Sequence, residues 1–218
     1  MKYCIAFCIP FLFISFSYSQ EFVLYSGLQN NLYFDFLDGN YYDSKSSLSS
    51  FVGLQYQHQN ETNSNKILLG INYQKYSSYE KHIIGGHSGT TETTNFNKSV
   101  LKFDIQPIGF HIEQHTFLNL GLGIEYLLSE VFSTYMRSWS MNTGTYVTSN
   151  PFTEANSTYS HQIVPLITGT LGTQFPLGKQ FKGIFQYQFS LGITPELKYG
   201  RAFKSFLILG ISKSLAEK

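Results

Sequence analysis

The sequence predicts an all-β protein in which eight antiparallel strands close into an up-and-down barrel. Its 218 residues include 20 Phe and 16 Tyr but only four alanines. Aromatic residues favour strands, whereas alanine favours helices. Large apolar residues alternate with small or polar residues along eight segments, which is the period of a strand with two different faces. Short and long connections alternate between these segments, and the length suits a single β domain.

Residues 1–19 are predicted to be a signal peptide, which leaves a barrel domain of residues 20–218. Lys2 supplies a positive start, residues 3–16 are apolar, and Ser17 and Ser19 are small residues where signal peptidase reads the chain. The apolar stretch is shorter than the roughly 20 residues of a membrane-spanning helix. Both cysteines lie in this signal, so the mature chain can form neither a disulfide nor a thiolate site.

The charge and the motifs of the mature chain exclude several classes of function. Without Lys2, it has 14 basic and 14 acidic residues, whereas a nucleic-acid partner requires a basic face. No phosphate-binding glycine loop or nucleophile elbow is present. His111 and His115 are four residues apart, but this spacing brings imidazoles together only on a helix. We therefore predict no cofactor, no metal site and no nucleic-acid partner.

The first four segments alternate large apolar residues with glycine, amides, hydroxyls and a few charges. Their apolar positions are Phe22, Leu24, Leu28 and Leu32; Val52, Leu54 and Tyr56; Ile67, Leu69, Ile71 and Tyr73; and Leu101, Phe103 and Ile105. After Pro107 the apolar parity changes, to Ile108, Phe110 and Ile112. A bulge of one residue restores the phase, and bulges are where strands tolerate proline. A bulge at Pro107 is therefore predicted.

The last four segments show the same alternation more strongly. Their apolar positions are Leu118, Leu120, Leu122, Ile124, Tyr126 and Leu128; Ile163, Ile167 and Leu171; Phe181, Phe185, Tyr187, Phe189, Leu191 and Ile193; and Leu207, Leu209, Ile211 and Leu215. The intervening positions are mostly Gly, Ser, Thr, Asn and Gln. Such side chains can pack and hydrogen-bond inside a narrow barrel, so this face is predicted to line the lumen.

The connections differ in length at the two ends of the predicted barrel. Residues 60–65, 113–116 and 176–180 form short turns, whereas residues 35–49, 79–96 and 130–160 are long and polar. Short turns at one end and long loops at the other are typical of transmembrane barrels. Aromatic residues near strand ends predict two interfacial girdles: Phe22, Phe117, Phe175 and Phe181 at the short-turn end, and Phe34, Phe51, Tyr76, Phe132, Tyr199 and Phe203 at the other.

A soluble carrier of the lipocalin type is the main alternative, because it also has eight alternating strands and a signal peptide. The polar face of a soluble strand meets water and usually holds Lys, Glu and Asp. In this chain, that face is dominated by small residues and amides. The apolar face runs for five or six alternate positions, close to the length that a tilted strand needs across a bilayer. These two features favour the transmembrane barrel.

The chain resembles the small eight-stranded outer-membrane β-barrel proteins of Gram-negative bacteria, the OmpA- and OmpX-like group, over residues 20–218. The stretch from Leu101 to Ile108 looks like the proline-containing fourth strand common in the outer membrane protein β-barrel family. The sequence ends on Leu215-Ala216-Glu217-Lys218, whereas such barrels usually end on an aromatic residue, so a weaker insertion signal is expected.

The resemblance implies a location in the cell outer membrane, with short periplasmic turns, long extracellular loops and both mature termini in the periplasm. It also implies partners: outer-membrane lipid, periplasmic chaperones and the barrel-assembly machinery.

Lys102, Asp104 and Glu125 form the one charged constellation predicted inside the barrel. Pairing through the turn at residues 113–116, with the bulge at Pro107, would put Asp104 opposite Glu125 and Lys102 on the diagonal. Two carboxylates and an amine could perform acid–base chemistry, because like charges raise one carboxyl pKa. A packing network that fills the lumen is the favoured interpretation.

The longest loop, residues 130–160, is the candidate interaction surface. It carries aromatic residues and an arginine of the kind enriched in binding interfaces, namely Tyr135, Arg137, Trp139, Tyr146 and Phe152. These side chains could equally fold back to cap the barrel mouth. The predicted function is a non-enzymatic outer-membrane barrel whose surface loops have an interaction or structural role. A lipid-modifying membrane enzyme, with His87 and Ser88 as the nearest Ser/His pair, and the soluble carrier remain as alternatives.

Overall fold

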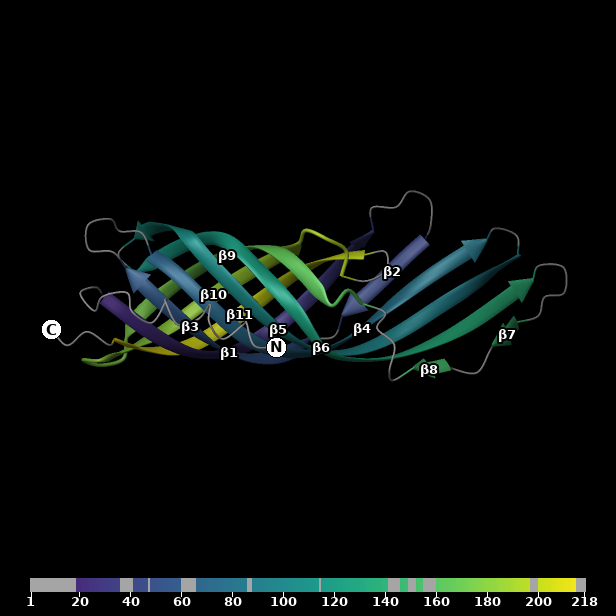
Figure 1. Cartoon of the computed structure of the whole chain (residues 1–218), viewed down its shortest axis with the longest axis horizontal. Coiled ribbons are helices and arrows are strands. Elements are labelled where there is room, and N and C mark those ends of the chain that lie inside the picture. The colour runs from purple at the N-terminus through teal and green to yellow at the C-terminus, as the bar shows by residue number, and fades with distance from the viewer. Residues whose placement is uncertain are drawn as a thin grey trace, which may run out of the picture.

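The structure is a computed structural model that describes residues 19–35, 41–46, 48–59, 66–85, 88–113, 115–140, 146–148, 152–154, 160–196 and 200–214 (Figure 1). Its strands are β1 (Ser19–Asp35), β2 (Tyr41–Ser46), β3 (Ser49–Gln59), β4 (Lys66–Gly85), β5 (Ser88–Glu113), β6 (Thr116–Ser140), β7 (Tyr146–Thr148), β8 (Phe152–Glu154), β9 (Ile163–Pro176), β10 (Phe181–Gly192) and β11 (Gly200–Ser214). No helix in these ranges is long and apolar enough to cross a membrane. Except for Ser19, the predicted signal peptide lies outside the described residues.

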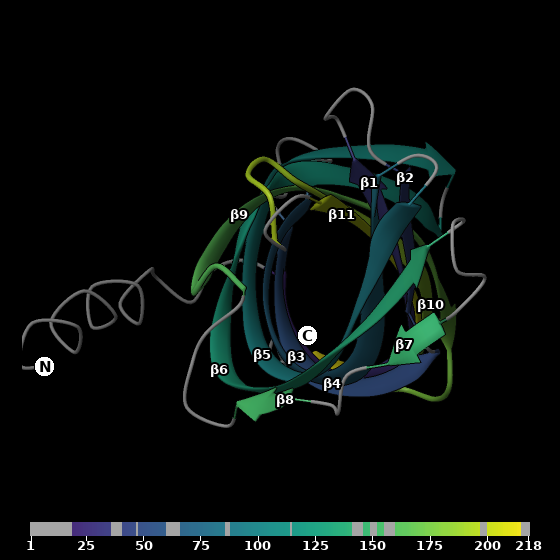
Figure 2. The ribbon, with the colours of Figure 1, turned by 90° about the vertical axis from the view of Figure 1, so that its right-hand side faces the viewer.

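Within the described ranges, eight of the strands pair antiparallel into a closed ring (Figure 2). The order around the ring is β1, β3, β4, β5, β6, β9, β10 and β11, and each of these strands contains one of the predicted segments. The ring closes where β1 pairs with β11, from Glu21 opposite Ser214 to Asp35 opposite Gly200. The predicted fold, an eight-stranded antiparallel up-and-down barrel, is confirmed.

The two faces of the barrel wall are the reverse of those of a water-soluble protein. Large apolar side chains point outward, and Leu24, Leu122 and Leu209 are 61%, 59% and 60% exposed. Polar side chains of the alternate positions, such as Gln29 and Asn119, are fully buried in the interior. Because successive residues of a strand point to opposite faces, the alternation in the sequence assigns the faces correctly.

The predicted bulge at Pro107 is confirmed. Ile105 pairs with Leu122 but Ile108 pairs with Leu120, so Gln106 and Pro107 lie opposite the single residue Gly121. A Cβ atom on Gly121 would lie 2.0 Å from the carbonyl oxygen of Ile105. Only glycine fits at this close approach of two backbones, which is a common use of glycine beside a bulge.

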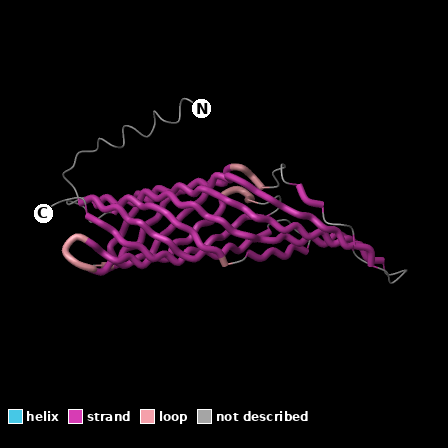
Figure 3. The backbone as a smooth tube through the Cα atoms, turned by 90° about the horizontal axis from the view of Figure 1, so that it is seen from below, coloured by secondary structure: helices cyan, strands magenta, loops and turns pink. Residues whose placement is uncertain are grey.

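Two of the predicted loops are largely strands. Pairing of β4 with β5 continues to Gly85 opposite Gly89, and pairing of β5 with β6 continues to Ser88 opposite Ser140. We call residues 79–85, 88–96 and 132–140 the strand extension; it projects beyond one end of the barrel (Figures 1 and 3). Strand β2 pairs with β4 along it, and β7 and β8 pair with β6. The Thr and Tyr residues of these stretches favour strands without supplying the apolar alternation of a lipid face.

The predicted aromatic girdles are only partly correct. Phe22, Phe175 and Phe181 point outward and are 50%, 46% and 45% exposed, and Phe203 is half-buried. Four other predicted girdle residues point into the barrel instead, because they lie at the inward-facing positions of their strands: Phe51, Tyr76, Phe117 and Phe132. The side chain of Phe34 and residue Tyr199 lie outside the described part of the chain.

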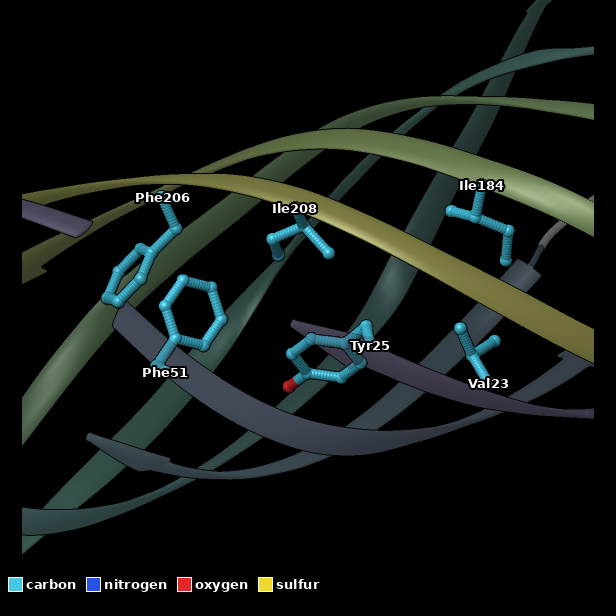
Figure 4. Packing of buried hydrophobic residues seen from close by; sticks show 6 residues of the cluster. All are labelled: Val23, Tyr25, Phe51, Ile184, Phe206 and Ile208. Atoms are coloured by element: carbon cyan, nitrogen blue, oxygen red, sulfur yellow. The ribbon is translucent and has the colours of Figure 1, made fainter. Parts of the chain in front are cut away.

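The interior is therefore not uniformly polar. One apolar cluster packs inside the barrel between β1, β3, β10 and β11 (Figure 4). Its members are Val23, Tyr25, Phe51, Ile184, Phe206 and Ile208. The rings of Phe51 and Phe206 meet edge to face at 5.3 Å, which is a favourable geometry for an aromatic pair. Large side chains thus fill this part of the lumen, and a second buried apolar cluster, of Tyr76, Val100 and Leu127, lies between β4, β5 and β6.

Candidate functional site

Lys102 and Asp104 on β5 and Glu125 on β6 all lie inside the barrel, as predicted, with exposures of 0%, 7% and 2%. Their predicted pairing is wrong, however. Glu125 lies opposite Lys102, and Asp104 lies opposite Gly123. The register shifts between His111 and Glu113 as well as at the Pro107 bulge. Each shift moves the pairing by one residue, and together they account for the two residues that separate the predicted pairing from the observed one.

The three predicted residues do not bond to one another. The ammonium of Lys102 donates to Ser190 Oγ at 2.7 Å and lies 4.4 Å from the centre of the Phe206 ring. The carboxylate of Asp104 accepts from the amides of Gln106 at 3.0 Å and Gln188 at 3.4 Å. In the described structure, the second carboxylate oxygen of Asp104 is buried without a hydrogen-bond partner. The direct contacts of Lys102 and Asp104 are thus with neutral groups.

Glu125 instead belongs to a second group of buried charges that the sequence did not reveal. Lys204 of β11 reaches across the lumen to Glu125 at 2.5 Å and also pairs with Glu196 at 2.8 Å. Lys98 of β5 pairs with Glu196 at 3.2 Å and lies 3.8 Å from Glu130. We call these five residues the lumen charge cluster. A cavity of about 10 Å³ beside it is large enough for roughly one water molecule.

Glu196 is the centre of the lumen charge cluster. It lies in the connection that follows β10, and its side chain is 3% exposed. Besides the two lysines, the hydroxyls of Tyr76 and Tyr33 donate to Glu196 Oε1 at 2.5 Å and 3.3 Å. Burial alone would raise the pKa of Glu196, but Lys204, Lys98 and the Tyr76 hydroxyl outweigh it and lower this pKa to about 2. Glu196 is therefore a buried anion held by donors from β1, β4, β5 and β11.

The lumen charge cluster also binds the connection that leads into β9, through Glu130. Glu130 accepts hydrogen bonds from the backbone NH of Ser160 at 3.1 Å and from the Ser160 hydroxyl at 2.5 Å. Two connections at the same end of the barrel are thus tied to charges inside it. On β5, Lys98 lies on the same face as Lys102 and Asp104, because alternate residues of a strand point to the same side. This alternation could have placed Lys98 in the lumen from the sequence.

A separate polar network fills the opposite end of the lumen. Lys182 pairs with Glu21, and the Gln174 amide donates to Glu21 at 3.3 Å and to Gln57 at 2.8 Å. Amide side chains continue this network between strands, as in the bond from Gln186 to Gln55 at 3.2 Å. These polar interactions cross-link the walls of the barrel from inside.

The candidate interaction residues lie on strands rather than in a loop. Tyr135, Arg137 and Trp139 share one face of β6, and Tyr135 and Arg137 are exposed. Tyr146 lies in β7 and Phe152 in β8, but their side chains are outside the described residues. Residue His87 and the Ser88 side chain, the nearest match to a catalytic pair, also lie outside them. In the described part of the chain, no three His, Cys, Asp or Glu side chains are grouped as metal ligands would be.

The fold and its faces define a class of protein. A closed ring of eight antiparallel strands, with an apolar exterior and an interior filled by its own side chains, is the architecture of the small OmpA- and OmpX-like barrels. The resemblance read from the sequence is confirmed at the level of this fold. A soluble lipocalin-like carrier is not favoured, because its exterior would be polar.

Comparison with known proteins finds similar solved structures but no family. The sequence matches no protein-family model, and no curated protein matches it. The solved structure of Neisserial surface protein A is similar, with 8% identity and a TM-score of 0.39 over 88% of this chain and 96% of that one. Ail, the attachment invasion locus protein of Yersinia pestis, is also similar, with 13% identity and a TM-score of 0.32 over 88% and 97% of the two chains.

Proposed function

We propose that this chain is an integral outer-membrane β-barrel protein without catalytic activity, and that its strand extension acts at the cell surface. The observation that carries the proposal is the reversal of the two faces of the wall. Outward-facing Leu24, Leu122 and Leu209 are each more than half exposed, whereas Lys98, Lys102 and Lys204 are buried inside. In water, this arrangement would expose a continuous apolar belt, but hydrocarbon solvates it.

The ends of the barrel support an orientation in that membrane. The turns that join β3 to β4, β5 to β6 and β9 to β10 lie at the same end as the start of β1 and the end of β11. In outer-membrane barrels, the end with short turns faces the periplasm. Both mature termini would therefore be periplasmic, and the strand extension would rise from the outer surface of the cell.

The buried charges favour a structural role over catalysis. The carboxylates of the lumen charge cluster are bonded to lysine and tyrosine side chains, and the cavity beside them has room for about one water. A catalytic carboxylate needs space for a substrate beside it. The packed interior also argues against a general diffusion pore.

Extraction and gel migration test the proposal. The protein should partition into the membrane fraction, dissolve only with detergent, and migrate faster on a gel when unheated than when boiled, because the folded barrel resists unfolding by the detergent. Protein that remains folded and soluble without detergent would contradict the proposal. The expected partners are outer-membrane lipid and, during insertion, periplasmic chaperones and the barrel-assembly machinery. Crosslinking during export tests these transient partners.

A further inference from the structure

The strand extension carries a groove on its outward face. Tyr79 and Lys81 of β4 form one side, Tyr135 and Arg137 of β6 form the other, and polar side chains of β5 form the floor. Thr93 pairs with both Lys81 and Tyr135, which places the two sides one strand apart. The groove has a volume of about 410 Å³, within the usual range for small-molecule sites. We call it the outer groove.

The outer groove faces the same way as the lipid belt. Tyr73, Lys75, Ser77, Tyr79 and Lys81 are alternate residues of β4 and therefore lie on one face of the sheet. Tyr73 is 42% exposed and belongs to the apolar belt. A molecule in the outer groove would therefore stand beside the barrel, in the layer directly above the surrounding lipid, rather than above the barrel mouth.

The height of the outer groove above the apolar belt restricts the kind of lipid that can reach it. Tyr79 lies six residues beyond Tyr73, a step of about 20 Å along the strand and roughly 15 Å in height at the usual tilt of a barrel strand. The headgroup layer of a phospholipid reaches only about 5 to 8 Å beyond the hydrocarbon. A lipid that fills the outer groove must carry a larger headgroup, such as a chain of sugars.

The lining of the outer groove indicates the charge of that headgroup. Among the described residues, Lys81 and Arg137 are the charged side chains that line it. Arginine binds phosphate through two parallel hydrogen bonds, and lysine adds a point charge. Tyr79 and Tyr135 supply flat apolar surfaces for sugar rings, and hydroxyl and amide groups of β5 can bond to sugar hydroxyls.

We propose that the outer groove binds the phosphorylated sugars of a glycolipid in the leaflet that surrounds the strand extension. This inference rests on the proposed function, because it requires the barrel to span that membrane. Bound glycolipid would join the strand extension to its own membrane through Lys81 and Arg137. The sideways direction of the outer groove favours this source over a soluble polysaccharide that approaches from outside the cell.

Binding to the full-length mature protein in nanodiscs tests this inference. The probes are lipopolysaccharide, the same lipid after phosphatase treatment, phosphatidylglycerol and a soluble sulfated polysaccharide. The variant is Lys81→Gln with Arg137→Gln. The matched control is Lys179→Gln with Lys213→Gln, which removes two exposed cations at the other end of the barrel. Faster migration of unheated protein on a gel checks that each variant is folded.

Lipopolysaccharide should bind the Lys81/Arg137 variant roughly tenfold more weakly than the wild type, as expected for the loss of two exposed charged contacts. The control should bind like the wild type, and phosphatase treatment should weaken wild-type binding to a similar extent. Equal binding by the two variants would overturn the inference, as would equal binding of phosphatidylglycerol or preferential binding of the soluble polysaccharide. These results would leave the proposed function intact, because only a barrel that is folded and soluble without detergent contradicts that.

Discussion

The carboxylate of Glu196 accepts a 2.5 Å hydrogen bond from the Tyr76 hydroxyl, although the two residues are 120 positions apart in the chain. Tyr76 belongs to β4, and Glu196 follows β10, which lies diametrically opposite β4 in the ring. The connection after β10 therefore brings its carboxylate across the mouth of the lumen. The stability of this end of the barrel should depend on that one side chain.

Replacement of Glu196 by glutamine should destabilise the protein strongly. Lys98 and Lys204 are fully buried, and the loss of their shared carboxylate would leave buried ammonium groups with less compensation. Breaking a buried ion pair by removing one partner typically costs about 3 to 5 kcal/mol. Urea unfolding in detergent micelles, followed by the gel shift, measures this cost.

Glu92→Gln is the matched control, because Glu92 is a partly exposed carboxylate on the same strand as Lys98. Its effect should stay below about 1 kcal/mol, as for most surface charges. Equal destabilisation by the two variants would mean that Glu196 has no special role in the lumen charge cluster.

The same site predicts a defined acid sensitivity. Because the pKa of Glu196 falls from the ordinary 4.5 to about 2 in the folded protein, its contribution is fully present above about pH 4.5. That contribution is lost as the pH falls from 4.5 through 2, where the folded protein also takes up the proton. The wild type should therefore lose more unfolding free energy between pH 5 and pH 2 than Glu196→Gln does. An equal loss of unfolding free energy by the two proteins between pH 5 and pH 2 would refute this prediction.

Asp104 and Glu125 should differ in their importance for stability, although both are buried carboxylates of the lumen. Glu125 pairs with Lys204, whereas Asp104 accepts only from amides among the contacts seen here. Glu125→Gln should cost several kcal/mol, on the order of a broken buried pair. Asp104→Asn should cost less, about 1 kcal/mol, because the contacts of Asp104 are hydrogen bonds from amides, which an asparagine oxygen can still accept. Thermal melts of the two variants give the comparison, and a larger loss for Asp104→Asn would contradict this account.

A cation on the outer face should impair insertion. Leu122 is 59% exposed in the middle of the β6 belt, where arginine at the bilayer midplane costs about 2 to 4 kcal/mol. Leu122→Arg should therefore lower both the yield of folded barrel and its unfolding free energy. Leu122→Phe keeps the face apolar and should behave like the wild type. Similar folding of the two variants in lipid vesicles would mean that this face does not contact hydrocarbon.

The faces of the strands could be predicted from the sequence because they depend only on local alternation. Leu122 and Glu125 were assigned to opposite faces by parity, and the Pro107 bulge was visible as a change of that parity. The strand extension was missed because residues 79–96 and 130–140 lack apolar alternation. Their strand structure instead depends on hydrogen bonding to neighbouring strands, which no single segment reveals.

The lumen charge cluster could not be predicted, because it joins strands that are not neighbours. Lys204 reaches Glu125 from three strands away around the ring, and the register of every intervening pair decides which side chains meet. The unseen shift near His111 moves the pairing by one residue, and together with the shift at the Pro107 bulge it separates Asp104 from Glu125 by two. Glu196 lies in a connection, where alternation carries no information about direction.

The seam between β1 and β11 makes the order of synthesis matter. Asp35 at the end of the first strand meets Gly200 at the start of the last, so the earliest and latest parts of the chain complete each other. Until the last strand has been made, β1 has an unpaired edge, and the apolar wall cannot be enclosed. The barrel therefore cannot close before β11 has been made, and removal of β11 should prevent closure rather than give a smaller barrel.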